Sequence, residues 1–542
     1  MREIFAKDYN VKNGDDITLK LKEMIEALRG EEGEKTIVFE KGEYKLTKEN
    51  ATKLNLYITN TIGDKEWKDG EEKHAYYTPI YVNGISNLTL DFGESVLTVY
   101  GKMNNAVITN SKNITIKNVE IRTDKPDLHE LKVVKRKGLT VEFEIDKESV
   151  YEKRGKDIIF VGKDYEYDLK NMSGIASWPW VANIKPDSLD KVRRVQHPLT
   201  MAKVKETTAH KIKATYFRPI NYKVGERFYI YDIRRKNVGI FAEKVENLVL
   251  LNVKQRFNYS LAVVCQNCKN ITLDRVDFSP LGDSLFCSLA DFIQICMCSG
   301  DVVVKDSNFE GAGDDCLNVH GFHFKIKEVK GSKLTVSFKH PQSYGFLPFD
   351  KGDEIAFIEP LSLKGIGRTN VICAKMLNEY DIELEVESAE HAKTGDVIEN
   401  ITKCPNLLFK NNKLNRIITR GILITTRGKV VVENNVFNSN GMHGILLSND
   451  AISWYESGRV EDITIKGNVF NSTEGYDIFI KPENLKHEEY VHKNITITGN
   501  VFNSDLTGGI YVKSSDNVVI KDNKIKEKNF KIEVKNSNVI SD

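Results

Sequence analysis

Three aspartates stand at related positions in the middle of the chain. Asp314 and Asp315 are adjacent and follow the glycine-rich turn Gly311-Ala-Gly313, and Asp291 precedes Asp314 by one step of an internal repeat. Converging carboxyl groups can hydrolyse a glycosidic bond, because one acid protonates the leaving oxygen while a carboxylate activates water. Carboxylates held close together also tend to keep a proton between them at neutral pH. Although an Asp-Asp pair often just caps a turn, the third acid favours a catalytic interpretation.

The repeat explains why the spacing of Asp291 and Asp314 matters. A polar residue, usually Asn, is followed by alternating Ile, Val, Leu or Thr, and the steps 247→270, 406→429 and 494→517 all equal the step 291→314. Period-two alternation predicts strands, and a repeat of about 20–50 residues predicts a solenoid. Ile, Val and Thr dominate the repeats, which argues against a leucine-rich solenoid. We therefore predict an all-β chain that forms a right-handed parallel β-helix, in which residues one period apart stack on neighbouring coils.

Helical spacing of Leu21, Met24, Ile25 and Leu28 predicts an N-terminal helix that caps one end of this tube. Two stretches lack the repeat and instead show alternating strands between turn signals, which predicts two inserted small antiparallel β-barrels rather than long structureless loops. The predicted units are the cap and first coils (1–125), an inserted barrel (126–234), the coils carrying the acids (235–322), a second barrel (323–400) and the C-terminal coils (401–542).

The overall composition indicates which classes of binding partner to expect. The chain has 78 Lys+Arg against 77 Asp+Glu, so no nucleic acid or membrane partner is expected. The first residues lack the apolar core of a signal peptide, which predicts a cytoplasmic protein, or a secreted one if a leader has been removed. Exposed coil edges and barrel faces leave room for a homo-oligomer.

All eight cysteines follow residue 264, a poor distribution for a disulfide framework. Cys265-x-x-Cys268 invites a metal interpretation, but the spacing matches no zinc-finger pattern and no histidine completes it. We expect small thiols packed inside the tube, and neither a metal nor another cofactor.

The string Gly311-Ala-Gly-Asp-Asp-Cys-Leu-Asn-Val-His-Gly321 resembles glycoside hydrolase family 110, the α-1,3-galactosidases, as do the two inserts and the stretch Ser448–Gly458. The resemblance spans most of the chain. More distantly, the three acids on a β-helix are similar to those of family 28 polygalacturonases. The resemblance implies exo-acting release of terminal α-1,3-linked galactose with inversion and without a metal.

The resemblance also implies roles for the three acids: Asp314 as general acid, and Asp291 and Asp315 as the carboxylates that hold the attacking water. Which of the two adjacent aspartates donates the proton stays open, because neighbours on a regular strand point opposite ways. The preceding glycines would supply a bend that turns both toward the cleft.

Several later residues are candidates for holding the sugar. Arg420 and His443 are one repeat step apart and so should share one wall, although an arginine at a turn is as often a solvated ion-pair partner. Trp454 is expected to form an apolar platform under a pyranose ring, or to pack beneath a loop; Trp178 and Trp180 would shape the cleft rim or fill the first barrel. The expected substrate-binding residues are Asn318, His320, Arg420, His443, Asn449, Asp450, Trp454 and Glu456.

Two other classes of function compete with this interpretation. A polygalacturonase-like hydrolase or a polysaccharide lyase would act on an acidic polysaccharide, but the Arg-x-Lys motif expected of polygalacturonases is not evident near Gly444. A lyase would need calcium held by several acids and a basic catalytic residue. A non-catalytic β-helix adhesin would need neither gathered acids nor bulky inserts.

Overall fold

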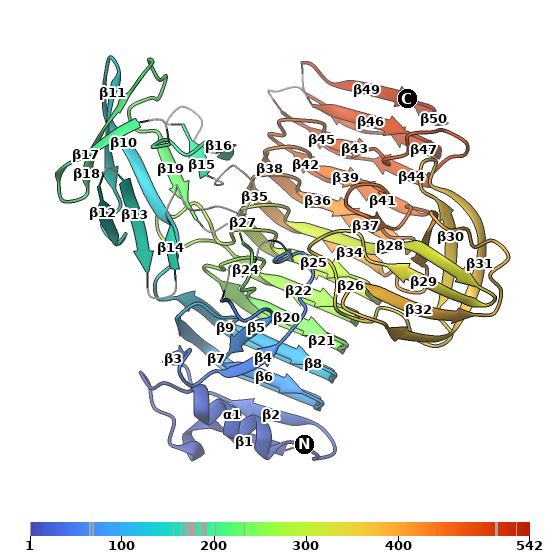
Figure 1. Cartoon of the computed structure of the whole chain (residues 1–542), viewed down its shortest axis with the longest axis horizontal. Coiled ribbons are helices and arrows are strands. Elements are labelled where there is room, and N and C mark those ends of the chain that lie inside the picture. Colours follow the sequence, from blue (N-terminus) through green and yellow to red (C-terminus); the bar gives the residue numbers. More distant parts are fainter. Residues whose placement is uncertain are drawn as a thin grey trace.

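Parallel strands stack in three rows along the axis of a tube, so the chain forms a β-helix with its two termini at opposite ends, N at the bottom and C at the top of Figure 1. The computed structural model describes residues 2–542 except 64, 66, 68–69, 156, 163–164, 168–180, 186–191, 201, 232–233, 505–507 and 527; Trp178 and Trp180 therefore lie outside the described residues. The first row contains β1 (Arg2–Phe5), β2 (Lys35–Val38), β7 (Ser86–Tyr100), β9 (Lys112–Thr123), β21 (Glu246–Gln255), β23 (Lys269–Asp274), β26 (Ser299–Lys305), β34 (Asn406–Lys410), β37 (Val430–Glu433), β41 (Ile463–Lys466), β44 (His492–Thr498), β47 (Ser515–Lys521) and β50 (Val539–Ser541).

The second row shares the long strands β7, β9 and β21 with the first. Its other members are β3 (Glu43–Thr47), β24 (Asp277–Phe278), β27 (Asn308–Ala312), β35 (Lys413–Ile417), β38 (Val436–Asn440), β42 (Val469–Phe470), β45 (Val501–Phe502) and β48 (Lys524–Ile525).

The third row carries the candidate site. It consists of β6 (Ile80–Asn83), β8 (Ala106–Thr109), β20 (Ile240–Glu243), β22 (Val263–Gln266), β25 (Ile293–Cys296), β28 (Leu317–Lys330), β36 (Ile422–Ile424), β39 (Ile445–Leu447), β43 (Ile478–Ile480), β46 (Gly509–Lys513) and β49 (Lys531–Lys535). Because side chains alternate along a strand, Ile293 and Ile295 of β25 enter the apolar interior while Gln294 between them faces outward.

Stacked asparagines mark the bends, as the repeat predicts. Asn247 donates from Nδ2 to Oδ1 of Asn113 over 2.6 Å, and Asn270 donates in the same way to Asn247 over 2.9 Å. All three residues have positive φ, a left-handed conformation that asparagine tolerates better than most residues. The amide ladder therefore satisfies polar groups at each bend and holds successive coils in register.

The N-terminal cap is α1 (Thr18–Ala27), preceded by β1 and the short 3₁₀ helix η1 (Ala6–Tyr9). Leu21, Met24 and Ile25 are fully buried against the first coils, as their spacing predicts. The helix begins after Ile17, and Asp16 Oδ1 accepts a hydrogen bond from the Thr18 amide over 3.0 Å. A hairpin of β4 (Thr52–Asn55) and β5 (Ala75–Thr78) adjoins these coils and contains the buried Tyr76.

The second insert is a closed antiparallel barrel on one side of the tube (Figure 1). The outer half of β28 pairs with β29 (Lys333–Ser337), and the ring continues through β32 (Asp381–Val386), β31 (Lys364–Met376), β30 (Glu354–Glu359) and β33 (Val397–Asn400) back to β28. The barrel thus grows directly out of a strand of the third row.

The first insert lies on the opposite side and, over its described residues, forms a seven-stranded antiparallel sheet with a smaller three-stranded sheet. The larger sheet has the order β16 (Val192–Val195), β15 (Val181–Ile184), β19 (Arg227–Ile230), β10 (His129–Lys137), β11 (Thr140–Ile145), β18 (Lys211–Tyr216), β17 (Ala202–Thr208); the smaller contains β12 (Tyr151–Arg154), β13 (Asp157–Gly162) and β14 (Tyr165–Tyr167). Tyr229 of this insert packs against Phe286, just before the coil that carries Asp291.

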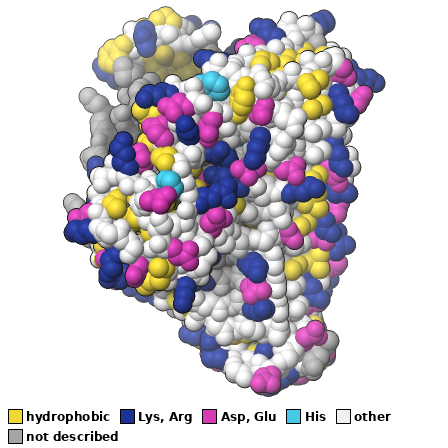
Figure 2. Space-filling model, turned by 90° about the vertical axis from the view of Figure 1, so that its right-hand side faces the viewer, with side chains coloured by type: hydrophobic (Ala, Val, Ile, Leu, Met, Phe, Trp, Pro, Cys, Tyr) yellow, Lys and Arg dark blue, Asp and Glu magenta, His cyan; other side chains and the backbone are white. Residues whose placement is uncertain are grey.

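Charge is mixed across the surface rather than separated. Figure 2 shows basic and acidic side chains interspersed over the face that carries the second insert. Six of the cysteines are buried free thiols: Cys265, Cys268, Cys287, Cys296, Cys298 and Cys316. Among the described residues, no helix is both long and apolar enough to cross a membrane.

Candidate active site

The three aspartates lie at the start of two neighbouring strands of the third row. Asp291 precedes β25, and Asp314 and Asp315 precede β28 in a bend rather than a regular strand. Gly311 has φ +80°, and a Cβ at Gly313 would lie 2.5 Å from the carbonyl oxygen of Leu289 on the preceding coil. The two glycines thus allow a close turn in which both adjacent carboxyl groups face the same cavity.

Coil register puts Asp291 beside Asp315. Ile293 pairs with Leu317, one position farther along than the repeat step predicts, and the Phe292 amide donates to the Asp315 carbonyl over 2.9 Å. On the next coil Leu317 pairs with Ile422, which brings Arg420 alongside Asp315. The catalytic candidates therefore occupy successive coils, in the stacking that the repeat predicts but shifted by a single position.

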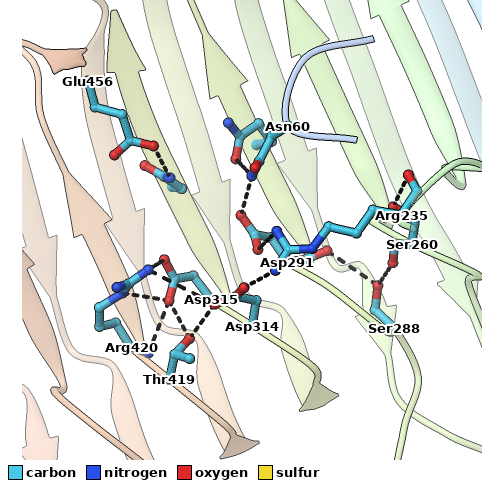
Figure 3. A network of polar contacts seen from close by, with 12 residues as sticks. Asn60, Arg235, Ser260, Ser288, Asp291, Asp314, Asp315, Thr419, Arg420 and Glu456 are labelled. Atoms are coloured by element: carbon cyan, nitrogen blue, oxygen red, sulfur yellow. Dashed lines mark hydrogen bonds and ion pairs between the residues drawn. The ribbon is translucent and has the colours of Figure 1, made fainter. Parts of the chain in front are cut away.

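Two arginines neutralise two of the acids (Figure 3). Arg420 binds Asp315 with two parallel contacts, Nε to Oδ1 at 2.8 Å and Nη2 to Oδ2 at 2.6 Å. Arg235 binds Asp314 through Nη2, and its Nη1 lies 4.0 Å from Asp291 Oδ1. Burial opposes the charge on both guanidinium groups, but the neighbouring aspartates outweigh it and raise the pKa of each arginine.

Asp291 differs from its two neighbours. Its side chain is 3% exposed, and its carboxyl group accepts one long hydrogen bond, from Asn60 Nδ2 at 3.4 Å. Burial first, and then the charges of Asp314 and Asp315, raise its pKa well above the usual range. In the free protein, burial and the two neighbouring charges therefore favour the protonated form of Asp291.

Thr419 joins the adjacent aspartates. Its hydroxyl oxygen lies 2.5 Å from Asp315 Oδ1 and 2.9 Å from Asp314 Oδ1. A hydroxyl group has one hydrogen to donate, so it can satisfy only one of two ionised carboxylates. A proton on Asp314 would supply the second hydrogen bond by donating to the Thr419 oxygen.

A cavity of about 350 Å³ opens above these acids. Away from them it is lined by Glu456, whose Oε1 accepts from Asn318 Nδ2 over 3.2 Å and lies 3.8 Å from His320 Nε2. Glu456 belongs to β40 (Glu456–Ser457), which pairs antiparallel with β28 where that strand leaves the tube. The site thus combines the outer face of the coils with a returning loop.

Trp454 lies at the rim of the cavity and is half exposed. Asp450 holds its loop, because its carboxylate accepts the amides of Ile452, Ser453 and Trp454 over 2.7 to 3.0 Å. The imidazole of His340, from the second insert, stacks on the indole with 4.7 Å between ring centroids. The indole is thus held by a ring contact while half of its surface stays accessible, as a sugar platform requires.

Eight of the eleven predicted site residues line the cavity: Asp291, Asp314, Asp315, Asn318, Arg420, Asp450, Trp454 and Glu456. His320 and Asn449 are buried behind that lining. His443 does stack one coil after Arg420, but its ring packs on Phe479 with 4.2 Å between centroids and does not line the cavity.

Three lining residues with charged or amide side chains were not predicted from the sequence: Asn60, Arg235 and Glu483. Arg235 precedes the first coil after an insert, and Asn60 comes from the loop that joins β4 to β5, so neither belongs to the repeat. Glu483 lies one coil beyond Asn449, whose carbonyl accepts the Glu483 amide over 3.0 Å. The sequence offered one signal for these residues. One coil beyond the Asn449-Asp450 stretch, the repeat leads to Glu483, and no such step leads to Asn60 or Arg235.

Three buried carboxyl groups, gathered in a cavity on the outer face of a parallel β-helix, are an arrangement typical of a β-helical glycoside hydrolase. Comparisons with known proteins give the same class. The chain is 32% identical to alpha-1,3-galactosidase A of Bacteroides thetaiotaomicron, over 85% of this chain and 80% of that protein. It is 29% identical to alpha-1,3-galactosidase B of Bacteroides fragilis, over 95% of this chain and 89% of that protein.

Residues 333–398 match the family model described as GLAA-B beta-barrel domain II, which falls within the second insert. The chain belongs to the α-1,3-galactosidase family, glycoside hydrolase family 110. Among solved structures it is similar to a family 28 exopolygalacturonase of Yersinia enterocolitica, with a TM-score of 0.42 and 10% identity, covering 99% of this chain and 78% of that one. The family assignment does not depend on that likeness.

Proposed function

We propose that this protein is an exo-acting, inverting glycoside hydrolase that releases terminal α-1,3-linked galactose from glycans. The observation that carries the proposal is the cluster of Asp291, Asp314 and Asp315 in a cavity of a chain that belongs to the α-1,3-galactosidase family. General acid and base catalysis needs one protonated and one ionised carboxyl group within reach of the same bond, and this cluster can supply both.

The size of the cavity supports exo action. About 350 Å³ is near the lower end of the range for ligand pockets, which suits a terminal sugar better than the middle of a polymer. Asn60 and Trp454, from separate loops, both line this space.

The charges in the cavity support a neutral sugar. Its lining contains six acidic residues (Asp291, Asp314, Asp315, Asp450, Glu456 and Glu483) against two arginines. Both arginines are already paired with aspartates. A uronate would meet net negative charge and no free cation among these lining residues, so an acidic polysaccharide fits this site poorly.

The same pairing argues against lyase chemistry. A lyase needs a basic residue that can give up its proton, whereas Asp314 and Asp315 raise the pKa of Arg235 and Arg420. Carboxylates already bound by arginine also have less negative charge to offer a calcium ion.

In the proposed mechanism, Asp314 donates a proton to the leaving oxygen, and Asp291 and Asp315 hold the attacking water. Asp291 and Asp315 stand side by side on neighbouring coils, an arrangement that can bind one water between them. Because burial and neighbouring charges favour a proton on Asp291 in the free protein, the mechanism requires that proton to move to Asp314 when substrate binds. Arg235 contacts both carboxyl groups, so loosening its ion pair with Asp314 would favour this transfer.

A linkage screen tests the proposal. Galactobioses linked α-1,3, α-1,4, α-1,6 and β-1,3 are incubated with the wild type and with Asp314→Asn, and free galactose is measured. We expect release from the α-1,3 isomer by the wild type alone. Equal release from all isomers, or normal turnover by Asp314→Asn, would refute it.

A further inference from the structure

A line of buried polar side chains runs behind the cavity from His320 to Asp291. Gln294, in the middle of β25, is fully buried and does not line the cavity. Its Nε2 lies 2.6 Å from Nε2 of His320, and its Oε1 lies 3.3 Å from Nδ2 of Asn60. Asn60 Nδ2 in turn lies 3.4 Å from Asp291 Oδ2.

The direction of each hydrogen bond in this line can be assigned by starting from His320, the end farthest from Asp291. His320 Nδ1 lies 2.8 Å from the carbonyl oxygen of Gly321, which can only accept, so Nδ1 carries a hydrogen. In the neutral ring Nε2 is then an acceptor and takes an N–H from Gln294. Gln294 must therefore present its oxygen to Asn60.

Asn60 is oriented by the same logic. Its amide nitrogen carries two hydrogens, and two acceptors face it: Gln294 Oε1 and Asp291 Oδ2. An Asn60 carboxamide with its nitrogen and oxygen exchanged would set oxygen against oxygen at Gln294. Gln294, which does not line the substrate cavity, thus fixes the Asn60 N–H that points to Asp291.

We propose that Gln294 is a positioning residue for Asp291, which it serves by holding the Asn60 carboxamide with its nitrogen toward the Asp291 carboxyl group. The inference rests on the proposed function only in taking Asp291 as one of the reacting acids. A hydrogen bond donated to a carboxyl group favours its ionised form. Gln294 therefore partly offsets the rise that burial causes in the pKa of Asp291.

Gln294→Met tests this, because methionine keeps the length of the side chain and removes both polar atoms. The readout is the infrared carbonyl band of protonated Asp291, assigned by its absence in Asp291→Asn and followed against pH. We expect its midpoint to rise by about one pH unit, the lower end of what a hydrogen bond to a charged group is worth. In activity assays, the limb of the kcat/KM profile that follows Asp291 should move upward with it, while KM stays within about twofold because Gln294 does not line the cavity.

Gln266→Met is the matched control. Gln266 is also fully buried and anchors the same segment, accepting from the Thr59 amide over 3.1 Å and donating to the Tyr57 carbonyl over 3.1 Å. It belongs to the preceding strand β22, and its carboxamide binds the backbone of that segment and, over 3.0 Å, Glu243 Oε1, but not the Asn60 side chain. The control should lose stability without moving the infrared midpoint.

Asn60→Gly provides a second variant if Gln294→Met fails to fold. Asn60 has φ +57°, which glycine adopts without strain, and the change removes the N–H itself. It should raise the midpoint as Gln294→Met does. An unmoved midpoint in both variants, or an equal shift in Gln266→Met, would overturn the proposal. If the wild type released no galactose from any linkage, the proposed function would fail while the infrared result would still stand.

Discussion

The cavity has two differently built parts. Around Asp314 and Asp315, arginines balance the acids before any substrate arrives. Around Glu456, the partners are the neutral amide of Asn318 and the ring of His320, and among the described residues no Lys or Arg lies within ion-pair distance of Glu456. In the proposed function, the first part supplies the carboxyl groups for bond cleavage, and the second offers a carboxylate that can accept hydrogen bonds from sugar hydroxyl groups.

Substitutions of the acids should have the largest effect and should separate their roles. Asp291→Asn, Asp314→Asn and Asp315→Asn should each lower kcat/KM on an α-1,3-galactobiose by about 10²–10⁴-fold. An aryl α-galactoside with a nitrophenyl leaving group needs little protonation, so it should restore much of the rate only in the variant that lacks the general acid. Rescue of Asp291→Asn instead of Asp314→Asn would exchange the proposed roles.

Stability should respond to two of these substitutions in opposite directions. Asp315→Asn removes the partner of the largely buried Arg420 and should lower the free energy of unfolding by about 3 kcal/mol. Asp291→Asn removes a buried carboxyl group whose folded-state pKa is raised. Stability from such a group is fully present below its unfolded pKa of about 3.9 and is lost as the pH rises through the folded value.

Asp291→Asn should therefore unfold at a higher temperature than the wild type at neutral pH, and the difference should vanish toward about pH 4. Calorimetry of both variants across this pH range checks the contrast. If Asp291→Asn and Asp315→Asn lowered the unfolding temperature equally at neutral pH, the two carboxyl groups would contribute to stability in the same way, which would contradict this contrast.

Glu456→Gln should affect binding more than bond cleavage. The substitution keeps the shape but replaces the charged acceptor beside Asn318. We expect KM to rise about tenfold, because a hydrogen bond to a charged group contributes about 1.5–3 kcal/mol. Steady-state kinetics with the α-1,3 disaccharide gives the comparison, and Glu483→Gln serves as a control on the same lining. A loss in kcat alone would place Glu456 with the reacting acids.

Trp454→Leu should have the smallest effect of the series. It removes the aromatic face that stacks on His340 but keeps apolar bulk at the rim. We expect KM to rise about two- to tenfold, in line with the extra ~0.5–1.5 kcal/mol of an aromatic contact, with little change in kcat. An unchanged KM would indicate that the indole packs on the loop alone.

The fold was predictable because each coil repeats a local pattern. The Asn113, Asn247 and Asn270 ladder, the alternating strands and the capping helix all follow from residues close in sequence. The same periodicity brought Asp291 to the Asp-Asp pair, with an error of a single position, because the coil from β25 to β28 is one residue longer than the repeat step and β26 within it has a register shift between Ser299 and Val302.

The rest of the site depends on contacts that no local pattern encodes. Arg235 reaches Asp314 from the end of an insert, and Asn60 reaches Asp291 from a loop far away in sequence. His443 illustrates the opposite error. The repeat correctly predicted that it stacks one coil after Arg420, but its ring packs on Phe479 instead of lining the cavity. Periodicity predicts which coil carries a residue, whereas the direction of its side chain depends on what packs around it.

The stereochemistry of the released sugar tests the central claim most directly. Proton NMR of an α-1,3-galactobiose, recorded in the first minutes after enzyme is added, distinguishes the anomers before they equilibrate. Inverting hydrolysis predicts that β-galactose appears first and the α-anomer later by mutarotation. Initial release of α-galactose, or no release from this linkage, would contradict the account.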